Sequence, residues 1–177
     1  TAIRLAEHKR RLELMSTRDG MTGVFNRRHW ETLLRNEFEA CRRSHRQATI
    51  LLIDIDHFKT INDTWGHDVG DEAIVAITRQ LQLTLRAGDY IGRFGGDEFA
   101  VIMSGTPAEN AIAAMARVHE RLVNMPLHGA PMARLCISVG VAPWGAQFTH
   151  YREWLKAADV ALYKAKNAGR GRTEVAA

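Results

Sequence analysis

The sequence predicts one domain of the α/β or α+β class, in which helices cover a central sheet. Short apolar runs rich in β-branched residues alternate along the chain with longer amphipathic stretches. Two of the short runs flank the dipeptide Gly95-Gly96, which predicts a tight hairpin turn. The chain has 177 residues, of which 46% are hydrophobic and 25% charged, and this suffices for one hydrophobic core. No internal repeat or low-complexity linker divides it.

The N-terminal segment, residues 1–16, is rich in Arg, Lys, Glu and Leu and predicts a helix. Four of its side chains follow the 3-4-3 spacing of a coiled-coil seam: Leu5, His8, Leu12 and Met15. Two heptads do not distinguish a signalling helix that pairs two copies from an ordinary amphipathic helix, so both interpretations stay open. Because the chain starts at Thr1 within this helix, we expect it to be cut from a longer protein. We divide it into a linker helix at 1–16 and a domain at 17–177.

Apolar periodicity predicts the remaining elements in turn. After a break at Asp19-Gly20, helices are predicted at 27–43, 57–64, 70–86, 107–125 and 151–168. Gly169 is expected to close the last helix. Strands are predicted at 48–54, 90–94, 98–103 and 135–141.

Charge and cysteine content exclude some classes of function. The formal net charge of +4 and the isoelectric point near 9.4 suit a polyanionic ligand, without choosing among nucleic acid, nucleotide and acidic lipid. No basic stripe with interleaved aromatic residues favours nucleic acid. Cys41 and Cys136 form no zinc-binding pattern and fit a reducing compartment. No apolar run is long enough to span a bilayer, and no signal peptide is visible.

Acidic residues gather at two places that a sheet could bring together. Asp97 and Glu98 directly follow the glycine pair, which by itself could be a plain acidic turn. Asp54 and Asp56 end an otherwise apolar strand, where oxygen ligands and the Ile55 carbonyl could hold Mg²⁺. For Asp56, capping of the following helix is an equally good interpretation.

Five stretches in order resemble the GGDEF family of diguanylate cyclases, over roughly residues 16–172. They are the opening motif at 19–28, the strand motif at 54–63, the Gly-His-Asp and Gly-Asp pairs at 66–71, the Gly-Gly-Asp-Glu-Phe signature at 95–99 and the C-terminal motif at 158–170. The resemblance implies a palm-like, mostly antiparallel sheet of about five strands wrapped by helices, similar to nucleotidyl cyclases. It implies that two GTP molecules are condensed into cyclic di-GMP, with release of two pyrophosphates, by a homodimer with facing sites.

The resemblance also assigns roles to individual residues. Mg²⁺ or Mn²⁺, expected as two ions per active site, would be held by Asp54, the Ile55 carbonyl, Asp97 and Glu98. Asp97 matches the general base, and Glu98 would assist. Guanine recognition falls to Asn62, His67 and Asp71. Substrate contacts are further expected at Phe58, Lys59, Gly95, Gly96, Lys166 and Arg170. The last two lie four residues apart, so a continuing helix would place both on one face.

An inhibitory product site is implied by Arg86 and Asp89, which match an R-x-x-D motif, with Arg117 as a second arginine. Product inhibition by cyclic di-GMP is therefore expected. The chain departs from the common pattern at Asp97, where many members carry Glu, at Gly171, where Asn is usual, and at His57, where an aromatic residue is frequent.

Two rival functions remain open: a non-catalytic module that binds GTP or cyclic di-GMP, and another nucleotidyl transferase on the same fold. The metal acids argue against the first, and the guanine residues argue against the second. We expect a cytoplasmic domain with no nucleic-acid partner. Any membrane association, as in an inner-membrane protein, would come through upstream segments outside this chain.

Overall fold

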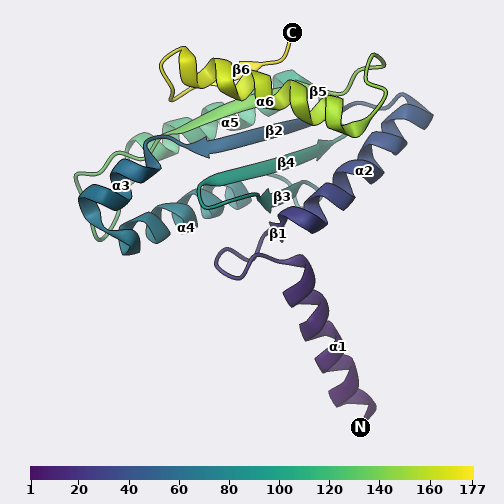
Figure 1. Ribbon diagram of the computed structural model, residues 1–177, viewed down its shortest axis with the longest axis horizontal. Coiled ribbons are helices and arrows are strands. Elements are labelled where there is room, and N and C mark those ends of the chain that lie inside the picture. Colours follow the sequence, from purple (N-terminus) through teal and green to yellow (C-terminus); the bar gives the residue numbers. More distant parts are fainter.

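A six-stranded sheet runs through the computed structural model, which describes residues 1–177 (Figure 1). The strands lie in the order β1-β3-β4-β2-β5-β6. Their bounds are β1 Phe25–Asn26, β2 Ala48–Ile55, β3 Tyr90–Arg93, β4 Glu98–Ser104, β5 Ile137–Pro143 and β6 Thr173–Val175. The central strand β2 pairs antiparallel with both β4 and β5, and every residue in it is buried.

The predicted fold class and the mostly antiparallel pairing are confirmed, but the sheet has six strands rather than about five. The two edge strands β1 and β6 pair in parallel with their neighbours. They are two and three residues long, which is too short to show a strand periodicity in the sequence.

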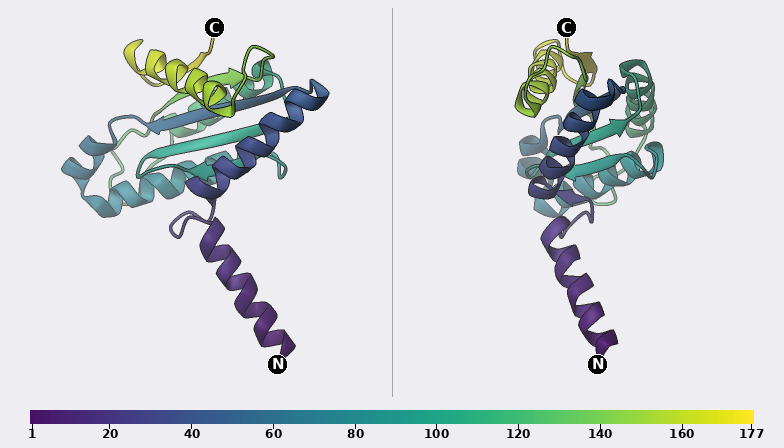
Figure 2. Two further views of the ribbon diagram at one scale, coloured as in Figure 1. Left: turned by 45° about the vertical axis from the view of Figure 1, so that its right-hand side comes forward. Right: turned by 90° about the vertical axis from the view of Figure 1, so that its right-hand side faces the viewer.

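Helices cover both faces of the sheet. They are α1 Ala2–Thr17, α2 Arg27–Ser44, α3 Phe58–Trp65, α4 His67–Thr84, α5 Ala108–Val123 and α6 Tyr151–Asn167. One core contains buried residues of α3, α4 and α5, and the other contains those of α2 and α6, on opposite sides of the sheet (Figure 2). Alternation along β2 sends Leu51 and Ile53 to the first core and Ile50 and Leu52 to the second.

The predicted helix and strand boundaries agree with the structure to within three residues. The largest difference is at α4, which begins at His67 rather than at residue 70. Gly66 has a φ of 92°, so it ends α3 and lets α4 start immediately afterwards. The first turn of α4 contains only one apolar residue, Val69, so the apolar periodicity did not show that the helix begins at His67.

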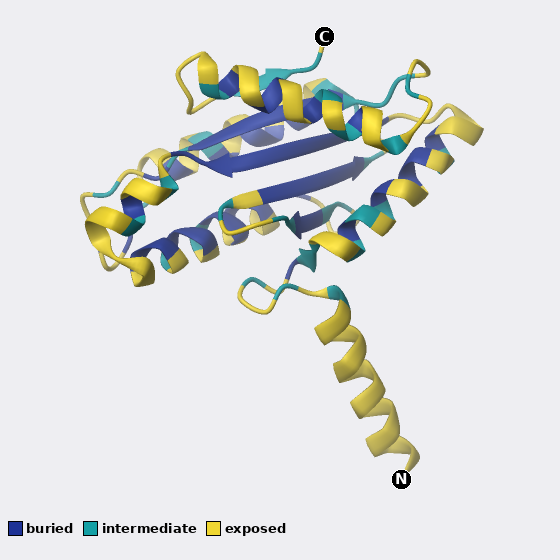
Figure 3. Ribbon diagram, viewed as in Figure 1, coloured by how far each residue is buried: buried dark blue, intermediate teal, exposed yellow.

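Helix α1 projects from the domain and has no buried residue (Figure 3). Leu5 and Met15, from the predicted seam, are 71% and 72% exposed. An apolar stripe therefore lies on this helix without a partner in the same chain. None of the helices is both long and apolar enough to cross a membrane.

Candidate active site

The two acidic segments meet at one end of the sheet. In Figure 1 the arrowhead of β2, the turn between β3 and β4, and the loop after α6 lie at this same end. The antiparallel register places Asp54 opposite Glu98. The Ile55 amide donates a hydrogen bond of 3.0 Å to the Asp97 carbonyl. Strand pairing thus brings together the acids that the sequence separates by more than forty positions.

The acids lie close enough to one another to affect their ionisation. Asp54 is 6% exposed, and its Oδ1 is buried without a hydrogen-bond partner. Burial raises the pKa of Asp54, and the charges of Asp97 and Asp56 add to this, while an ion pair with Lys166 opposes it. Burial likewise raises the pKa of Glu98, assisted by Asp54 and Asp97. A cation at this place would relieve both effects.

The donor atoms fit a hard divalent cation. No three His, Cys, Asp or Glu side chains stand close enough to hold a metal ion on their own. Mg²⁺ typically takes one or two carboxylates and completes its shell with waters and substrate phosphates. The unpaired Oδ1 of Asp54 and the carboxylate of Asp97, at the turn paired to Ile55, can supply that protein part.

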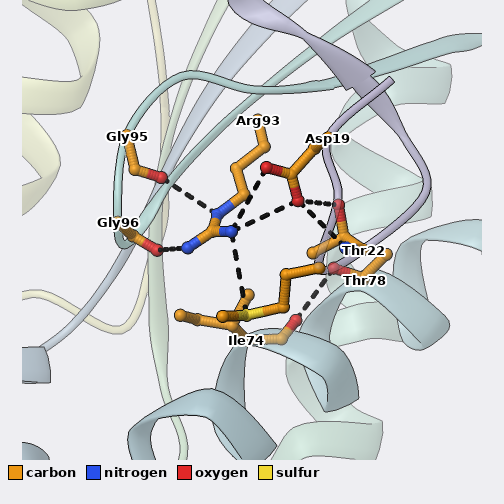
Figure 4. A network of polar contacts seen from close by, with 8 residues as sticks. Asp19, Thr22, Ile74, Thr78, Arg93, Gly95 and Gly96 are labelled. Carbon is orange, nitrogen blue, oxygen red and sulfur yellow. Dashed lines mark hydrogen bonds and ion pairs between the residues drawn. The ribbon is translucent and has the colours of Figure 1, made fainter. Parts of the chain in front are cut away.

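The turn that carries Asp97 is held by Arg93 (Figure 4). Its guanidinium donates to the carbonyls of Gly95 and Gly96, at 3.1 and 2.9 Å, and to Asp19 Oδ2 at 3.2 Å. Asp19 also accepts hydrogen bonds from the amide and hydroxyl of Thr22. Burial alone would raise the pKa of Asp19, but the hydrogen bonds from Thr22 and Arg93 lower it. The glycine turn is thereby tied to the loop that directly follows α1.

The predicted guanine residues lie around the junction of α3 and α4. Asn62 is on α3, and its side-chain Oδ1 is buried without a partner. His67 and Asp71 are exposed and lie four apart on α4, hence on one face. Gly70 gives Asn62 its space, because a Cβ at this position would come within 1.9 Å of Asn62 Oδ1. The structure thus brings these three residues to one corner with an unsatisfied acceptor.

The predicted phosphate ligands come from two directions. Phe58 and Lys59 begin α3, whose N-cap His57 has a φ of 53° and makes no side-chain cap bond, so the first amides remain available. Lys166 lies near the end of α6 and pairs with Asp54. The expectation that Lys166 and Arg170 share one helix face is wrong, because α6 ends at Asn167 and Arg170 lies in a left-handed turn with a φ of 63°.

The capping interpretation of Asp56 is also wrong. His57, not Asp56, is the N-cap of α3. The Asp56 carboxylate instead accepts hydrogen bonds from the Ser138 hydroxyl and the Gly171 amide. It is held by residues far away along the chain, which local sequence patterns do not reveal.

The predicted inhibitory motif lies at the start of β3, away from the acids. The Asp89 carboxylate accepts a hydrogen bond of 2.8 Å from the Arg86 amide. Burial raises the pKa of Asp89, and this hydrogen bond and the charge of Arg86 oppose the rise. Both residues line a cavity of about 370 Å³, and Arg18 lines it too. Arg117, on α5, is not among the residues that line it.

A family model described as diguanylate cyclase, GGDEF domain, matches residues 16–172. The chain belongs to the GGDEF family. It is 76% identical to the probable diguanylate cyclase DgcC of Escherichia coli, over 100% of this chain and 48% of that protein. It is 35% identical to the diguanylate cyclase DgcM of Escherichia coli, over 95% of this chain and 41% of that protein. The chain thus spans about half the length, or less, of these relatives.

Solved GGDEF structures share the fold along nearly the whole chain. The coiled coil and GGDEF domain of DgcB from Caulobacter crescentus, in complex with c-di-GMP, has a TM-score of 0.93 and 26% identity. That match covers 99% of this chain and 93% of that one. Diguanylate cyclase SiaD of Pseudomonas aeruginosa, in complex with its activator SiaC, has a TM-score of 0.85 and 33% identity, covering 99% of this chain and 68% of SiaD.

Sequence reasoning missed some residues that shape this GGDEF site. Arg93 and Asp19 stand inside recognisable motifs, yet no role was assigned to them. Their signal was their place beside the glycine pair and at the start of the opening motif. Arg18 carries no motif signal, and only the folded chain places it at the Arg86 cavity.

Proposed function

We propose that the chain is the catalytic domain of a diguanylate cyclase that joins two GTP molecules into cyclic di-GMP. The observation that carries the proposal is the pairing of Asp54 with Glu98 across β2 and β4, with Asp97 at the adjoining turn. A cluster of acids around one buried carboxylate, that of Asp54, is typical of a site that handles a metal-bound triphosphate.

Asp54, Asp97 and the Ile55 carbonyl would hold Mg²⁺ or Mn²⁺, with Glu98 assisting, and two ions per site are expected. When bound, such ions lower the pKa of an attacking hydroxyl and offset charge on the phosphates. The unpaired Oδ1 of Asp54 supports this assignment. Asp97 would accept the proton from the attacking 3′-hydroxyl.

Asn62, His67 and Asp71 would select guanine. A carboxylate such as Asp71 can accept the N1–H and N2–H donors of guanine, which adenine lacks. A site built around such hydrogen bonds strongly rejects the base that cannot make them. Asn62 lies against Gly70, the chain neighbour of Asp71, which supports a site shared by these residues.

The triphosphate would lie between the start of α3 and the end of α6. The free amides at Phe58 and Lys59, the Lys59 ammonium, and the Lys166 and Arg170 cations can all meet phosphate oxygens. Gly95 and Gly96 allow the turn to approach the substrate closely. In the reaction, each 3′-oxygen forms a bond to the α-phosphorus of the other GTP, and the bond to the β-phosphate oxygen breaks to release pyrophosphate.

One site of this kind holds one GTP, and each cyclic di-GMP is made from two GTP molecules. Two copies of the chain would therefore face each other during the reaction. The exposed apolar side chains of α1, such as Leu5, Leu12 and Met15, are suited to pair two copies. The similarity to a solved coiled coil and GGDEF domain supports this use of residues 1–16 as a linker helix, with the catalytic domain at 17–177. Holding two substrates together would supply much of the rate.

Product inhibition would act through Arg86 and Asp89, with Arg117 as the second arginine. The cavity beside Arg86 supports a ligand site there. GTP is a cytoplasmic nucleotide, so the domain would work in the cytoplasm. Any membrane anchor would belong to segments outside this chain.

The acids provide the most direct test of the site. The purified chain should convert GTP and Mg²⁺ into cyclic di-GMP, and Asp97→Ala should abolish the product. Glu39→Ala is a matched control, because Glu39 pairs only with Arg42 on the surface of α2. If the unchanged chain binds GTP but makes no product even when fused to a dimerising coiled coil, the non-catalytic module is the better description.

A further inference from the structure

The turn after α6 adopts an unusual backbone. Gly169, Arg170 and Gly171 have successive φ angles of 118°, 63° and 58°. Left-handed angles cost little at glycine, but Arg170 carries a side chain and is strained there. Such a conformation persists only where the surroundings hold it in place. Another part of the protein must therefore hold this turn in its conformation.

Asp56 is the side chain that holds the turn. It lies just past the end of β2 and is 5% exposed. Its Oδ2 accepts a hydrogen bond of 2.8 Å from the Gly171 amide, and its Oδ1 accepts one of 2.6 Å from the Ser138 hydroxyl. Both oxygens of the carboxylate are thus engaged by protein donors, on β5 and on the turn.

Backbone hydrogen bonds fix the turn on either side of this contact. The Arg170 amide donates to the Ala165 carbonyl at 3.0 Å, and the Val139 amide donates to the Arg172 carbonyl at 2.9 Å. Lys166, one residue past Ala165 on α6, forms the ion pair with Asp54. The end of β2, which carries Asp54, and the turn that carries Arg170 are therefore linked through one buried carboxylate.

We propose that Asp56 is a positioning residue for substrate: it fixes the backbone of the 169–171 turn so that Arg170 meets the triphosphate. The proposal rests on the proposed function, because it takes Arg170 to be a phosphate ligand. We assign Asp56 this anchoring role rather than a metal-binding one, because each of its carboxylate oxygens already accepts a hydrogen bond, from Ser138 and from Gly171. The second acid of the Asp-Ile-Asp sequence thus has a different task from the first.

Substitution by asparagine separates this role from a role as a charged ligand. In Asp56→Asn, the amide oxygen can accept from the Gly171 amide, while the amide NH₂ donates to Ser138 Oγ. We expect the KM for GTP to stay within about threefold of the parent value, because both hydrogen bonds survive. Asp54→Asn, measured alongside, should be nearly inactive. If Asp56→Asn is as inactive as Asp54→Asn, the carboxylate charge itself is needed and the proposal is wrong.

Substitution by alanine removes the anchor. In Asp56→Ala we expect the KM for GTP to rise at least about tenfold, with a smaller change in kcat, because the Gly171 amide loses its charged acceptor. Ser138→Ala is the matched control, since it removes the β5 hydrogen bond and leaves the Gly171 contact, so its KM should stay near that of the parent. An unchanged KM in a folded Asp56→Ala protein would overturn the proposal.

The pathway through Arg170 is tested by a double substitution. If Asp56 acts by placing Arg170, then Asp56→Ala combined with Arg170→Ala should bind GTP no more weakly than Arg170→Ala alone. Fully additive losses would contradict this. If Asp56→Ala fails to fold, the comparison of Asp56→Asn with Asp54→Asn still decides the proposal.

Binding of a GTP analogue with a methylene bridge between the α- and β-phosphates gives a readout that needs no turnover. Its affinity should fall in Asp56→Ala and in Arg170→Ala, and stay near the parent value in Asp56→Asn. An inactive parent chain would contradict the proposed function, whereas unchanged analogue affinity in Asp56→Ala would contradict only the role of Asp56.

Discussion

The two ends of strand β2 are built differently. At its start, Thr49 is fully buried and donates a hydrogen bond of 2.7 Å to the Thr106 carbonyl, and the Trp144 amide donates to the Ala48 carbonyl. At its other end, Asp54 is buried with an unpaired oxygen. The first end keeps one neutral unpaired donor, Trp144 Nε1, whereas the second keeps an unpaired carboxylate oxygen among like charges.

Backbone strain is greater at the acidic end but is present at both. His57 and Arg170 have positive φ at the acidic end, and His45, the third such non-glycine residue, lies just before β2 at the other. Strain and unpaired polar groups reduce stability and persist at sites where a ligand uses them. The comparison teaches that the acidic end of β2 is shaped for a ligand, whereas the opposite end is shaped for the fold.

The largest effect should come from Asp54→Asn. We expect activity to fall on the order of 100- to 1,000-fold, because the metal loses a charged ligand. The free energy of unfolding should not decrease, because the substitution removes a buried carboxylate whose pKa is raised. Initial rates of pyrophosphate release and thermal unfolding measure the two quantities. A clear loss of stability with retained activity would assign Asp54 to the fold.

Arg93→Ala should come next in size. Losing the donors to the carbonyls of Gly95 and Gly96 frees the turn that carries Asp97, and a small misplacement can cost about 100-fold in rate. Arg93→Lys should not restore the rate, since an ammonium cannot reproduce the planar fork. The measurement is kcat at saturating GTP. A fully active Arg93→Lys variant would show that the planar guanidinium contacts to the Gly95 and Gly96 carbonyls are not needed for activity.

At the opposite end, Thr49→Val should change stability and leave activity intact. The Thr106 carbonyl would lose its buried partner, which costs about 1–3 kcal/mol in the free energy of unfolding. Denaturant unfolding measures this cost, and the same sample serves for the rate of GTP conversion. A rate reduced as strongly as in Arg93→Ala would remove the contrast between the two ends.

The smallest effect concerns pH and Asp19. Its pKa is lowered from the usual 3.8, so its hydrogen bonds stabilise the folded state above that pH. As the pH falls through the lowered folded-state pKa, this contribution is lost. We therefore expect Asp19→Asn to be less stable than the parent by about 1 kcal/mol near neutral pH, with the difference shrinking below pH 3.8. Denaturant midpoints at several pH values test the sign.

The sequence allowed much of the acidic end to be predicted. The apolar run at 48–54 indicated a buried strand, and the glycine pair indicated the hairpin, so the meeting of Asp54 with Glu98 follows from simple strand pairing. The predicted guanine-binding residues, Asn62, His67 and Asp71, were assigned from the resemblance to the family motifs alone. Their clustering depends on the tight junction at Gly66, which the helix prediction placed only approximately.

The rest depended on contacts between distant segments. Arg93 reaches Asp19 across 74 positions, and Asp56 reaches Gly171 across 115. No local periodicity contains such information. The end of α6 was predicted to within one residue, but the expectation that Arg170 shares a helix face with Lys166 was wrong, because Arg170 lies in a left-handed turn beyond the helix.

The measurement that tests the central claim most directly is product analysis at increasing protein concentration. The chain is incubated with GTP and Mg²⁺, and the products are separated by chromatography. We predict cyclic di-GMP with two pyrophosphates for each product molecule, and a rate per protomer that rises with concentration as facing pairs form. A cyclic mononucleotide, a linear dinucleotide as end product, or no product from a dimerised chain would contradict the account.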